Sequence, residues 1–409
     1  MARAAGPEVL ELNLRATSCR EAGPVPERRR GTSPQLDRSA RVRLCTTSLI
    51  KIVAIMELKE KTTRKTAAAM ILSVDATFIA LLAMTLIVLV VTGLAATRYP
   101  TVPILDSDDL IPRGDDGWLV RYVHSRGVTI LFGLTYLRLA LALLAFDFGE
   151  GRRLAWLCWA GCLWAANFVA LSGTMATLLH GDYWLSLVMI GLFTYWFPSL
   201  SDWLFQTVMW HPRPLQLILL HGMVAGAVVS FSCGVLLAAR RRVVARLSTI
   251  SWSARFALCA AILAGSMVVA WLMAWPAPFD NPDNLFLANP SQTPPHIMPE
   301  WYITPWFQMI RSMPTKGAGS IVLWIAPLLP LLVTLLPRPR QLPTRIILTL
   351  ATSLLIIAFV ILSTIGRSDF FWQLQLPSFT LTAFYFAYFI VFVPLLTLVD
   401  RALGRDDAA

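Results

Sequence analysis

Eight long apolar stretches constrain this sequence more than any other feature. A window of about 19 residues, the length of helix that crosses roughly 30 Å of hydrocarbon, finds them from residue 71 onward. The chain is 56% hydrophobic and only 14% charged, against about 25% charged in ordinary soluble domains. The sequence therefore predicts an all-α transmembrane protein. The predicted spans are approximately 71–96, 122–146, 154–178, 215–239, 254–275, 319–337, 343–364 and 379–400.

The charged residues predict how these spans are oriented. Basic blocks fall in the connections 150–153, 239–246 and 337–345, whereas acidic stretches lie in the connection between the first two spans. Because basic residues accumulate on the cytoplasmic side of membrane proteins, we expect the N-terminus to be cytoplasmic. The net charge of +11 is then explained by topology in a lipid bilayer, with no nucleic acid as partner.

Residues 1–69 differ from the rest of the chain. They are basic, and apolar runs long enough for a span begin only after them. We interpret them as a disordered basic extension. An alternative is that translation begins at Met56, whose following residues are typical of a cytoplasmic flank.

Two segments between the spans are predicted not to cross the membrane. The stretch 182–208 is apolar but interrupted by Pro198, so we expect helices that lie at the membrane interface. The loop 276–318 faces outward and is the longest connection, and long loops in compact proteins are usually functional. It contains most of the stretch "TPPHIMPEWYITPWFQMIRSMPTKGAGS", residues 293–320, in which proline corners surround Glu300.

Three motifs in this order resemble one family. They are "GWLVRYVHSRG" (117–127), "FDNPDNLFLANPSQTPPHIMPEWY" (279–302) and "IRSMPTKGAGSI" (310–321). Together they resemble cytochrome b, the haem-bearing, quinol-oxidising subunit of cytochrome bc complexes. The resemblance implies an eight-helix cytochrome b-type bundle. Residues 70–250 would be its haem-binding four-helix region, 251–402 its C-terminal region with the quinol loop, and 403–409 a tail.

The resemblance also implies a quinol-oxidation site. Pro299-Glu300-Trp301-Tyr302 matches the signature of that site in the family. Glu300 would take a proton from quinol as electrons leave, with Tyr302 as the second catalytic residue, and a positioned carboxylate is suited to that task. A solvated loop carboxylate is the alternative for Glu300. We interpret His296 as a loop histidine that hydrogen-bonds backbone.

Haem ligation in the family uses two histidines 14 residues apart on each of two facing helices. Fourteen residues are about four turns and about 21 Å of helix, so this spacing stacks two haems across a bilayer. Here His124 is followed after 14 residues by Arg138, and His221 by Val235. Neither replacement can ligate iron. The sequence therefore predicts one haem b near the outer face, with His124 and His221 as iron ligands.

Other positions fit the loss of the inner haem. By resemblance, Arg121 would lie near a haem propionate and Gly93 would let the haem edge approach the backbone. The position 14 residues before Gly93 is Ile79, whose side chain would fill the inner haem's space. The connection after 239 is also shorter than the family's inner quinone-reduction site requires. Arg138 stays open between a functional charge and one that snorkels or pairs with phospholipid, Asp75 or Asp147.

Two functions follow as hypotheses. The first is an electron-transfer subunit of a multi-subunit quinol:cytochrome c-type oxidoreductase, which works with a Rieske iron–sulfur protein and a c-type cytochrome in a bacterial plasma membrane. One haem cannot carry an electron across roughly 30 Å of bilayer, so we expect a dimer, with itself or with a standard cytochrome b. The second is a haem-poor structural or assembly subunit that keeps the cytochrome b scaffold without catalytic turnover. It is favoured by residues 170–187, which replace a run that forms part of the family's outer quinol pocket.

Overall fold

The computed structural model describes a part of the unit Ile71–Ala409. The described ranges are 77–98, 117–148, 152–177, 179–206, 214–247, 282–286, 288–337, 339–368 and 372–406, with scattered positions between 253 and 268. The predictions for residues 1–69, including the start at Met56, lie outside them. Most of the predicted span 254–275 does so as well.

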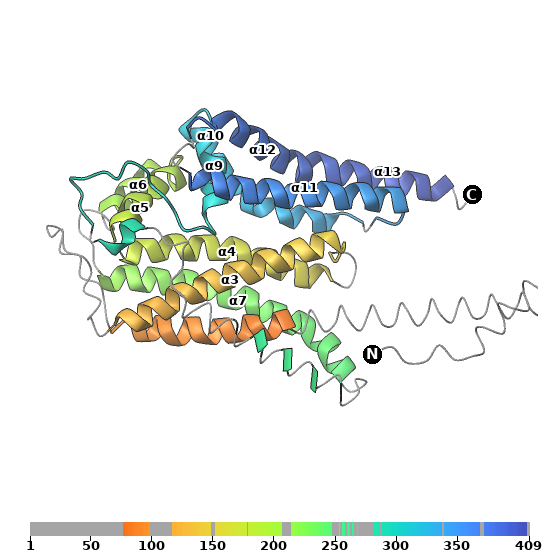
Figure 1. Cartoon of the computed structure of the whole chain (residues 1–409), viewed down its shortest axis with the longest axis horizontal. Helices are drawn as coiled ribbons and strands as arrows, with labels where there is room; N and C mark the ends of the chain where they lie inside the picture. The colour runs from red at the N-terminus through yellow and green to blue at the C-terminus, as the bar shows by residue number, and fades with distance from the viewer. Residues whose placement is uncertain are drawn as a thin grey trace, which may run out of the picture. The chain divides into compact units, whose positions relative to one another are not determined.

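The described residues are almost entirely helical, and no β-sheet occurs among them. Figure 1 shows the helices in chain order. The first, Thr77–Ala96, is drawn in orange. The others are α3 (Trp118–Leu144), α4 (Arg153–Thr177), α5 (His180–Phe193), α6 (Pro198–Phe205), α7 (Pro214–Leu247), η2 (Pro282–Leu285), α9 (Thr304–Arg311), α10 (Lys316–Ile325), η3 (Ala326–Leu335), α11 (Leu342–Gly366), α12 (Gln375–Ala387), η4 (Tyr388–Phe392) and α13 (Val393–Asp406).

Seven helical segments are long and apolar enough to cross a membrane, and each overlaps one predicted span. The all-α transmembrane fold is therefore confirmed. The count of eight stays a prediction, because the remaining span falls mostly outside the described residues. The stretch 182–208 forms the short helices α5 and α6, neither of which is among the seven. The seven are Thr77–Ala96, Leu119–Leu144, Arg153–Thr177, Ile218–Ala238, Lys316–Leu335, Leu342–Gly366 and Gln375–Leu403.

Local sequence explains several helix boundaries. Thr315 caps α10 by accepting a hydrogen bond from the backbone N–H of Ala318 at 3.2 Å. The next segment, η3, is a 3-10 helix that contains Pro330, which lacks the N–H an α-helix needs at an interior position. Helix α3 ends at Leu144. Two residues later Phe146 has a φ of 53°, and the N–H of Asp147 donates to the carbonyl of Ala142 at 2.7 Å.

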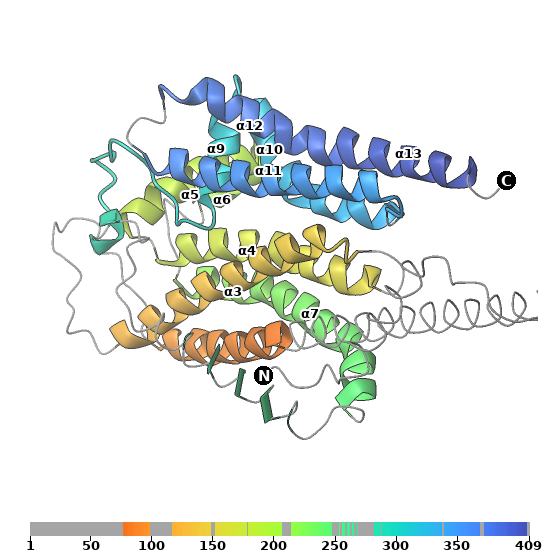
Figure 2. The ribbon, with the colours of Figure 1, turned by 45° about the vertical axis from the view of Figure 1, so that its right-hand side comes forward.

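The helices form two groups that meet along α4 (Figures 1 and 2). Helices α3, α4 and α7 pack together beside Thr77–Ala96, and α11, α12 and α13 lie on the other side with α10 and η3. Helix α4 contacts both groups, and its Trp156 donates from Nε1 to the carbonyl of Pro330 at 2.9 Å. A largely apolar core runs through both groups.

Helix α11 runs from one end of this unit to the other. Near its start, the guanidinium of Arg345 lies 5.8 Å from the ring centroid of Phe146. Near its other end, Ser363 donates to the carbonyl of Trp301 at 3.3 Å. The basic connection 337–345 and the predicted quinol loop therefore lie at opposite ends of the helices, as the topology prediction requires.

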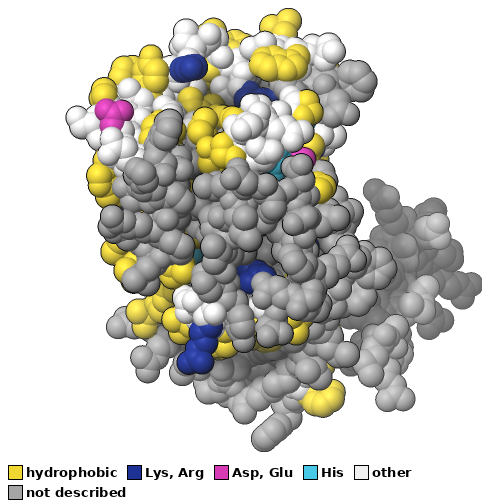
Figure 3. All heavy atoms as spheres, turned by 90° about the vertical axis from the view of Figure 1, so that its left-hand side faces the viewer, with side chains coloured by type: hydrophobic (Ala, Val, Ile, Leu, Met, Phe, Trp, Pro, Cys, Tyr) yellow, Lys and Arg dark blue, Asp and Glu magenta, His cyan; other side chains and the backbone are white. Residues whose placement is uncertain are grey.

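The end that carries α5 and α6 exposes apolar side chains. Figure 3 faces this end and shows hydrophobic side chains spread over the described part of its surface. The exposed aromatic residues of the α5–α6 segment are Tyr195, Trp196, Phe197 and Trp203. Aromatic side chains with a polar tip are typical of the membrane–water interface.

Candidate functional site

All six residues that the sequence predicts for the site line one cavity of about 240 Å³. The cavity lies at the end of the bundle where the 293–320 stretch folds over α3 and α4. Residues more than 200 positions apart in sequence therefore meet in one place. The six are Gly93, Arg121, His124, His221, Glu300 and Tyr302.

His124 of α3 and His221 of α7 face each other across this cavity. Their ring centroids are 6.3 Å apart, and the ring planes meet at 72°. A ring nitrogen lies about 1.1 Å from its centroid and a metal–imidazole bond is about 2.0 Å long, so two axial imidazoles on one metal ion have centroids about 6 Å apart. The separation therefore fits two ligands of a single iron.

Hydroxyl groups on two further helices fix the tautomers of these histidines. Thr92 Oγ1 lies 3.0 Å from His124 Nδ1, and Ser172 Oγ lies 3.0 Å from His221 Nδ1. Each hydroxyl can also donate its proton to a backbone carbonyl of its own helix, and in that arrangement it accepts from the ring. The proton then sits on Nδ1, and Nε2 keeps the lone pair that a metal needs.

Two glycines lie directly against the imidazole rings. A Cβ on Gly93 would lie 3.1 Å from His124 Cε1, and a Cβ on Gly173 would lie 3.3 Å from His221 Cε1. Any side chain at either position would press on a ring and turn it. Gly93 was predicted as a glycine that lets the haem edge approach the backbone, which stays a prediction, and Gly173 was not predicted as a site residue.

The space beside the two rings is large enough for a cofactor. A second cavity, of about 720 Å³, shares His124 and His221 with the first and extends among apolar side chains of Thr77–Ala96, α3, α4 and α7. Ligand sites commonly measure about 300–1,000 Å³. Apolar walls, two neutral imidazoles and the Arg121 cation at the outer rim together fit a haem, whose anionic propionates a guanidinium can bind.

The inner half of the same helices is packed with side chains. Positions 14 residues inward from Gly93, Gly173 and His221 are Ile79, Trp159 and Val235, and the last two are buried. The ring of Phe231 lies so close to Gly161 that a Cβ there would be 2.5 Å from it. Side chains therefore fill this part of the bundle.

Arg138 takes part in an ion-pair group at the inner end. Its Nη2 lies 3.0 Å from Asp147 Oδ2, and Arg152 pairs with the same carboxylate oxygen. Arg138 and Asp147 are both buried. Of the readings left open by the sequence, pairing with Asp147 agrees with these contacts.

The segment around Glu300 is fixed against α3. Tyr136 donates to the carbonyl of Tyr302 at 2.6 Å, and Trp306 Nε1 donates to the Tyr136 hydroxyl at 2.7 Å. The rings of Tyr302 and Phe132 stack with centroids 4.3 Å apart. Tyr302 is buried and Glu300 half-buried, so the carboxylate is held at the cavity wall by a rigid aromatic support.

Sequence reasoning missed a second carboxylate and its amide partner. Asn284 Nδ2 donates to Asp182 Oδ1 at 2.9 Å and lies 3.4 Å from Glu300 Oε1. Asp182 lines the cavity from α5, and burial raises its pKa to about 6. An acidic residue in the predicted interfacial stretch was the available signal. His296 contacts a side chain, since its Nε2 lies 3.2 Å from Arg311 Nη1.

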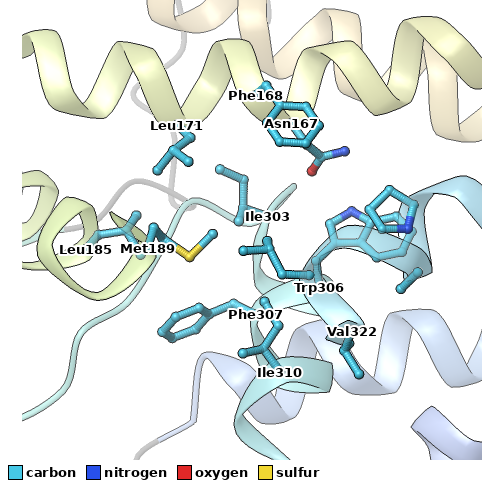
Figure 4. Close-up of a pocket in the computed structure, with 13 residues that line it drawn as sticks. Asn167, Phe168, Leu171, Leu185, Met189, Ile303, Trp306, Phe307, Ile310 and Val322 are labelled. Atoms are coloured by element: carbon cyan, nitrogen blue, oxygen red, sulfur yellow. The ribbon is translucent and has the colours of Figure 1, made fainter. Parts of the chain in front are cut away.

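A separate apolar pocket lies where α4, α5, α9 and α10 meet (Figure 4). Leu171 of α4, Met189 of α5 and Phe307 of α9 are among the side chains around it. Its volume is about 30 Å³, which is about one water molecule. Glu300 is not among its lining residues.

Comparisons with known proteins agree on one family. The family model described as "Cytochrome b(C-terminal)/b6/petD" matches residues 287–386. The chain is 27% identical to the cytochrome b of Neurospora crassa, over 80% of this chain and 90% of that protein, and 26% identical to that of Epidermophyton floccosum, over 80% and 87%. Its fold matches a chain of "Hyperthermophilic respiratory Complex III" with a TM-score of 0.59 and 18% identity, over 80% of this chain and 92% of that chain. The resemblance drawn from the motifs is thus confirmed, and the chain is similar to the cytochrome b proteins of bc complexes.

Proposed function

We propose that this chain is a membrane electron-transfer subunit of a quinol-oxidising cytochrome bc-type complex, with one haem b near its outer face. His124 and His221 would be the axial ligands, and Arg121 would neutralise a propionate. Haem b, when bound, supplies a one-electron carrier. Glu300 would accept a proton from quinol, beside Tyr302.

The observation that carries this proposal is the pair of facing imidazoles. Their centroids are separated by 6.3 Å, as two ligands of one iron would be. With Thr92 and Ser172 donating to backbone carbonyls and accepting from the rings, both histidines would carry the Nδ1–H tautomer. Both rings also line the same cavity, one from α3 and one from α7, as two ligands of one iron would.

The proton chemistry is supported by the position of Glu300. Glu300 lines the same cavity as His124 and His221, and its Oε1 lies 3.4 Å from Asn284 Nδ2. A half-buried carboxylate in a braced segment can take a proton from a bound hydroxyl without a large rearrangement.

Electron exit would require a partner. The inner half holds no counterpart of the histidine pair, and about 21 Å of packed helix separates the outer site from the inner end. We expect a Rieske iron–sulfur protein and a c-type cytochrome on the outer side, and a dimer with this chain or with a standard cytochrome b within the bilayer. Exposed Leu94, Leu219 and Met223 at the mouth of the larger cavity support a lateral contact.

Haem stoichiometry tests the proposal. We expect one haem per purified chain and a reduced-minus-oxidised spectrum of low-spin haem b after dithionite. His124→Leu and His221→Leu should lose it, while His180→Leu, whose ring accepts from the backbone of Asn289, should keep it. Two haems per chain, or one haem retained in both ligand variants, would contradict the ligand assignment.

Quinol oxidation is tested separately. Glu300→Gln should lower the rate of haem reduction by quinol at least tenfold, and leave the dithionite spectrum unchanged. Unchanged turnover would count against the proton-acceptor role while leaving the haem site in place.

One observation favours a second candidate function. The apolar pocket in Figure 4 is lined by Ile303, Trp306 and Phe307 of the segment that follows Glu300, and its volume of only about 30 Å³ leaves no room there for a quinol head group. A structural or assembly subunit of a bc-type complex would need no such space. Purified chain that binds haem but is not reduced by quinol would support this alternative.

A further inference from the structure

Asp182 is a buried carboxylate at the functional cavity. Its residue is only 5% exposed, and it lies in the first turn of α5. The side chain does not cap the helix. It points instead to α4 and η2, where Thr177 Oγ1 donates to its Oδ2 at 2.5 Å and Asn284 Nδ2 to its Oδ1 at 2.9 Å.

Asn284 joins this carboxylate to the one at the quinol loop. Its Nδ2 carries two protons, and one can be directed at Asp182 while the other is directed at Glu300 Oε1, 3.4 Å away. The carbonyl oxygen of the same amide accepts from the backbone N–H of Asp182 at 3.0 Å. Asn284 is thus fixed on both sides, and it holds the two carboxylates at the wall of one cavity.

We propose that Asp182 is a second proton acceptor of this site, which receives across the cavity the proton that Glu300 has taken from quinol. This rests on the proposed function. The Glu300 carboxylic acid loses its proton and becomes a carboxylate, and the Asp182 carboxylate becomes a carboxylic acid. Glu300 is then charged again and can accept the next proton.

The electrostatics of the cavity suit this exchange. Burial raises the pKa of Asp182 from 3.8 to about 6, although the hydrogen bonds from Thr177 and Asn284 lower it. A carboxyl with such a pKa holds a proton near neutral pH and still releases it. The other charged or titratable groups of the cavity, of α5 and of the elements that pack on α5 are Arg121, His124, His221, Glu300, Tyr302, His180, Tyr183, Asp202, Asp283, Lys316, Arg153, Cys158 and Cys162.

Three variants test the proposal in the complete, haem-loaded chain. Asp182→Asn keeps the shape of the side chain and cannot take a proton. Thr177→Val removes a hydrogen bond that favours the charged form of Asp182, so it should raise the pKa further. Asp202→Asn is the matched control, because Asp202 is an exposed carboxylate on the neighbouring α6.

The measurement is the rate of haem reduction by decylubiquinol between about pH 5 and about pH 9. In the natural chain we expect the rate to change with pH around a midpoint near pH 6. This pH dependence should disappear in Asp182→Asn, whose rate should fall about tenfold. It should move to higher pH in Thr177→Val and remain in Asp202→Asn. An Asp182→Asn profile that matches the natural chain overturns the proposal.

Infrared spectroscopy gives a readout that does not depend on turnover. A protonated carboxyl band should titrate with a midpoint near pH 6, shift upward in Thr177→Val and be missing in Asp182→Asn. Absence of that band from the natural chain overturns the relay. A natural chain that shows the band but is not reduced by quinol at any pH refutes the proposed function, and the relay with it, whereas normal turnover in Asp182→Asn refutes the relay alone.

Discussion

Two hydroxyl groups make the histidine pair suitable for a metal. Thr92 and Ser172 can each donate to a backbone carbonyl of their own helix and accept a hydrogen bond from an imidazole Nδ1–H. Partners of this kind orient a ligand ring and keep its metal-binding lone pair available. Neither residue carries a motif, which is why the sequence did not predict them.

Removal of these hydroxyls should weaken haem binding. In Thr92→Val with Ser172→Ala, both rings lose the group that fixes their tautomer and orientation, and loss of such partners typically costs about 10–100-fold in metal affinity. Haem retention after stepwise dilution in detergent measures this. The control is Thr85→Val, a buried threonine of the same first helix whose hydroxyl bonds only the carbonyl of Leu81 in the described structure. Equal haem retention in the double variant and the control would contradict the role of the hydroxyls.

Asp182 should also make the free energy of unfolding depend on pH. Its folded-state pKa of about 6 lies above the 3.8 of the unfolded chain, so the folded state binds the proton more tightly. The associated stability is fully present below pH 4, as an approximate limit, and is lost as pH rises through about 6. Asp182→Asn, which does not titrate, should therefore gain on the order of 2–3 kcal/mol over the natural chain between acidic and alkaline pH.

Thermal unfolding in detergent measures this difference. The melting temperature of Asp182→Asn relative to the natural chain should be higher at pH 8 than at pH 4, and Asp202→Asn should show no such trend. A constant difference between Asp182→Asn and the natural chain at all pH values would mean that Asp182 is not a buried titrating group.

At the scale of the helices, one bundle contains two halves with opposite packing. In the outer half, glycines and histidines leave cavities of about 240 and 720 Å³ between Thr77–Ala96, α3, α4 and α7. In the half of the bundle away from His124 and His221, the same helices pack tightly. A Cβ on Gly234 would lie only 2.6 Å from Cys158 Sγ. The step of 14 residues, about four helical turns, relates the two halves.

That step explains what the sequence could predict and what it could not. Helix existence followed from apolar length, because a lipid-spanning helix needs little else. Gly93, His124 and His221 followed from the resemblance to cytochrome b and its 14-residue spacing, and the same spacing relates Gly173 to Trp159. The contact between Asp182 and Asn284 joins residues 102 positions apart, and no local pattern specifies such a pairing.

Restoring the inner histidines should not restore a second haem. In Arg138→His with Val235→His, both missing ligands return, but Ile79, Trp159 and Phe231 still occupy the space. The double variant also removes the Arg138 contact to Asp147, so it should be less stable by a few kcal/mol. Haem counting on the purified variant should give no more haem than the natural chain. A second haem would show that packing does not close the inner half.

At the scale of the whole described unit, the two ends differ in chemistry. One end holds the histidine pair, Glu300 and the aromatic residues of α5 and α6, and the other holds the Arg138 ion pairs and the basic connection before α11. Asp400 near the C-terminus accepts backbone hydrogen bonds from Arg340 and Gln341 at 2.8 Å, which ties that connection to α13. This polarity predicts the direction in which the chain lies in its membrane.

Thiol labelling can test the direction. In a chain whose own cysteines are replaced, Ser291→Cys lies in the exposed quinol loop and Arg340→Cys in the exposed basic connection. Since basic connections face the cytoplasm, a membrane-impermeant maleimide should label Ser291→Cys in intact cells and Arg340→Cys only after the membrane is opened. Both positions are hydrophilic and exposed, so equal labelling of the two variants in detergent serves as the control. The reverse pattern in intact cells would invert the topology, and would place the candidate haem and the Glu300 cavity on the cytoplasmic side.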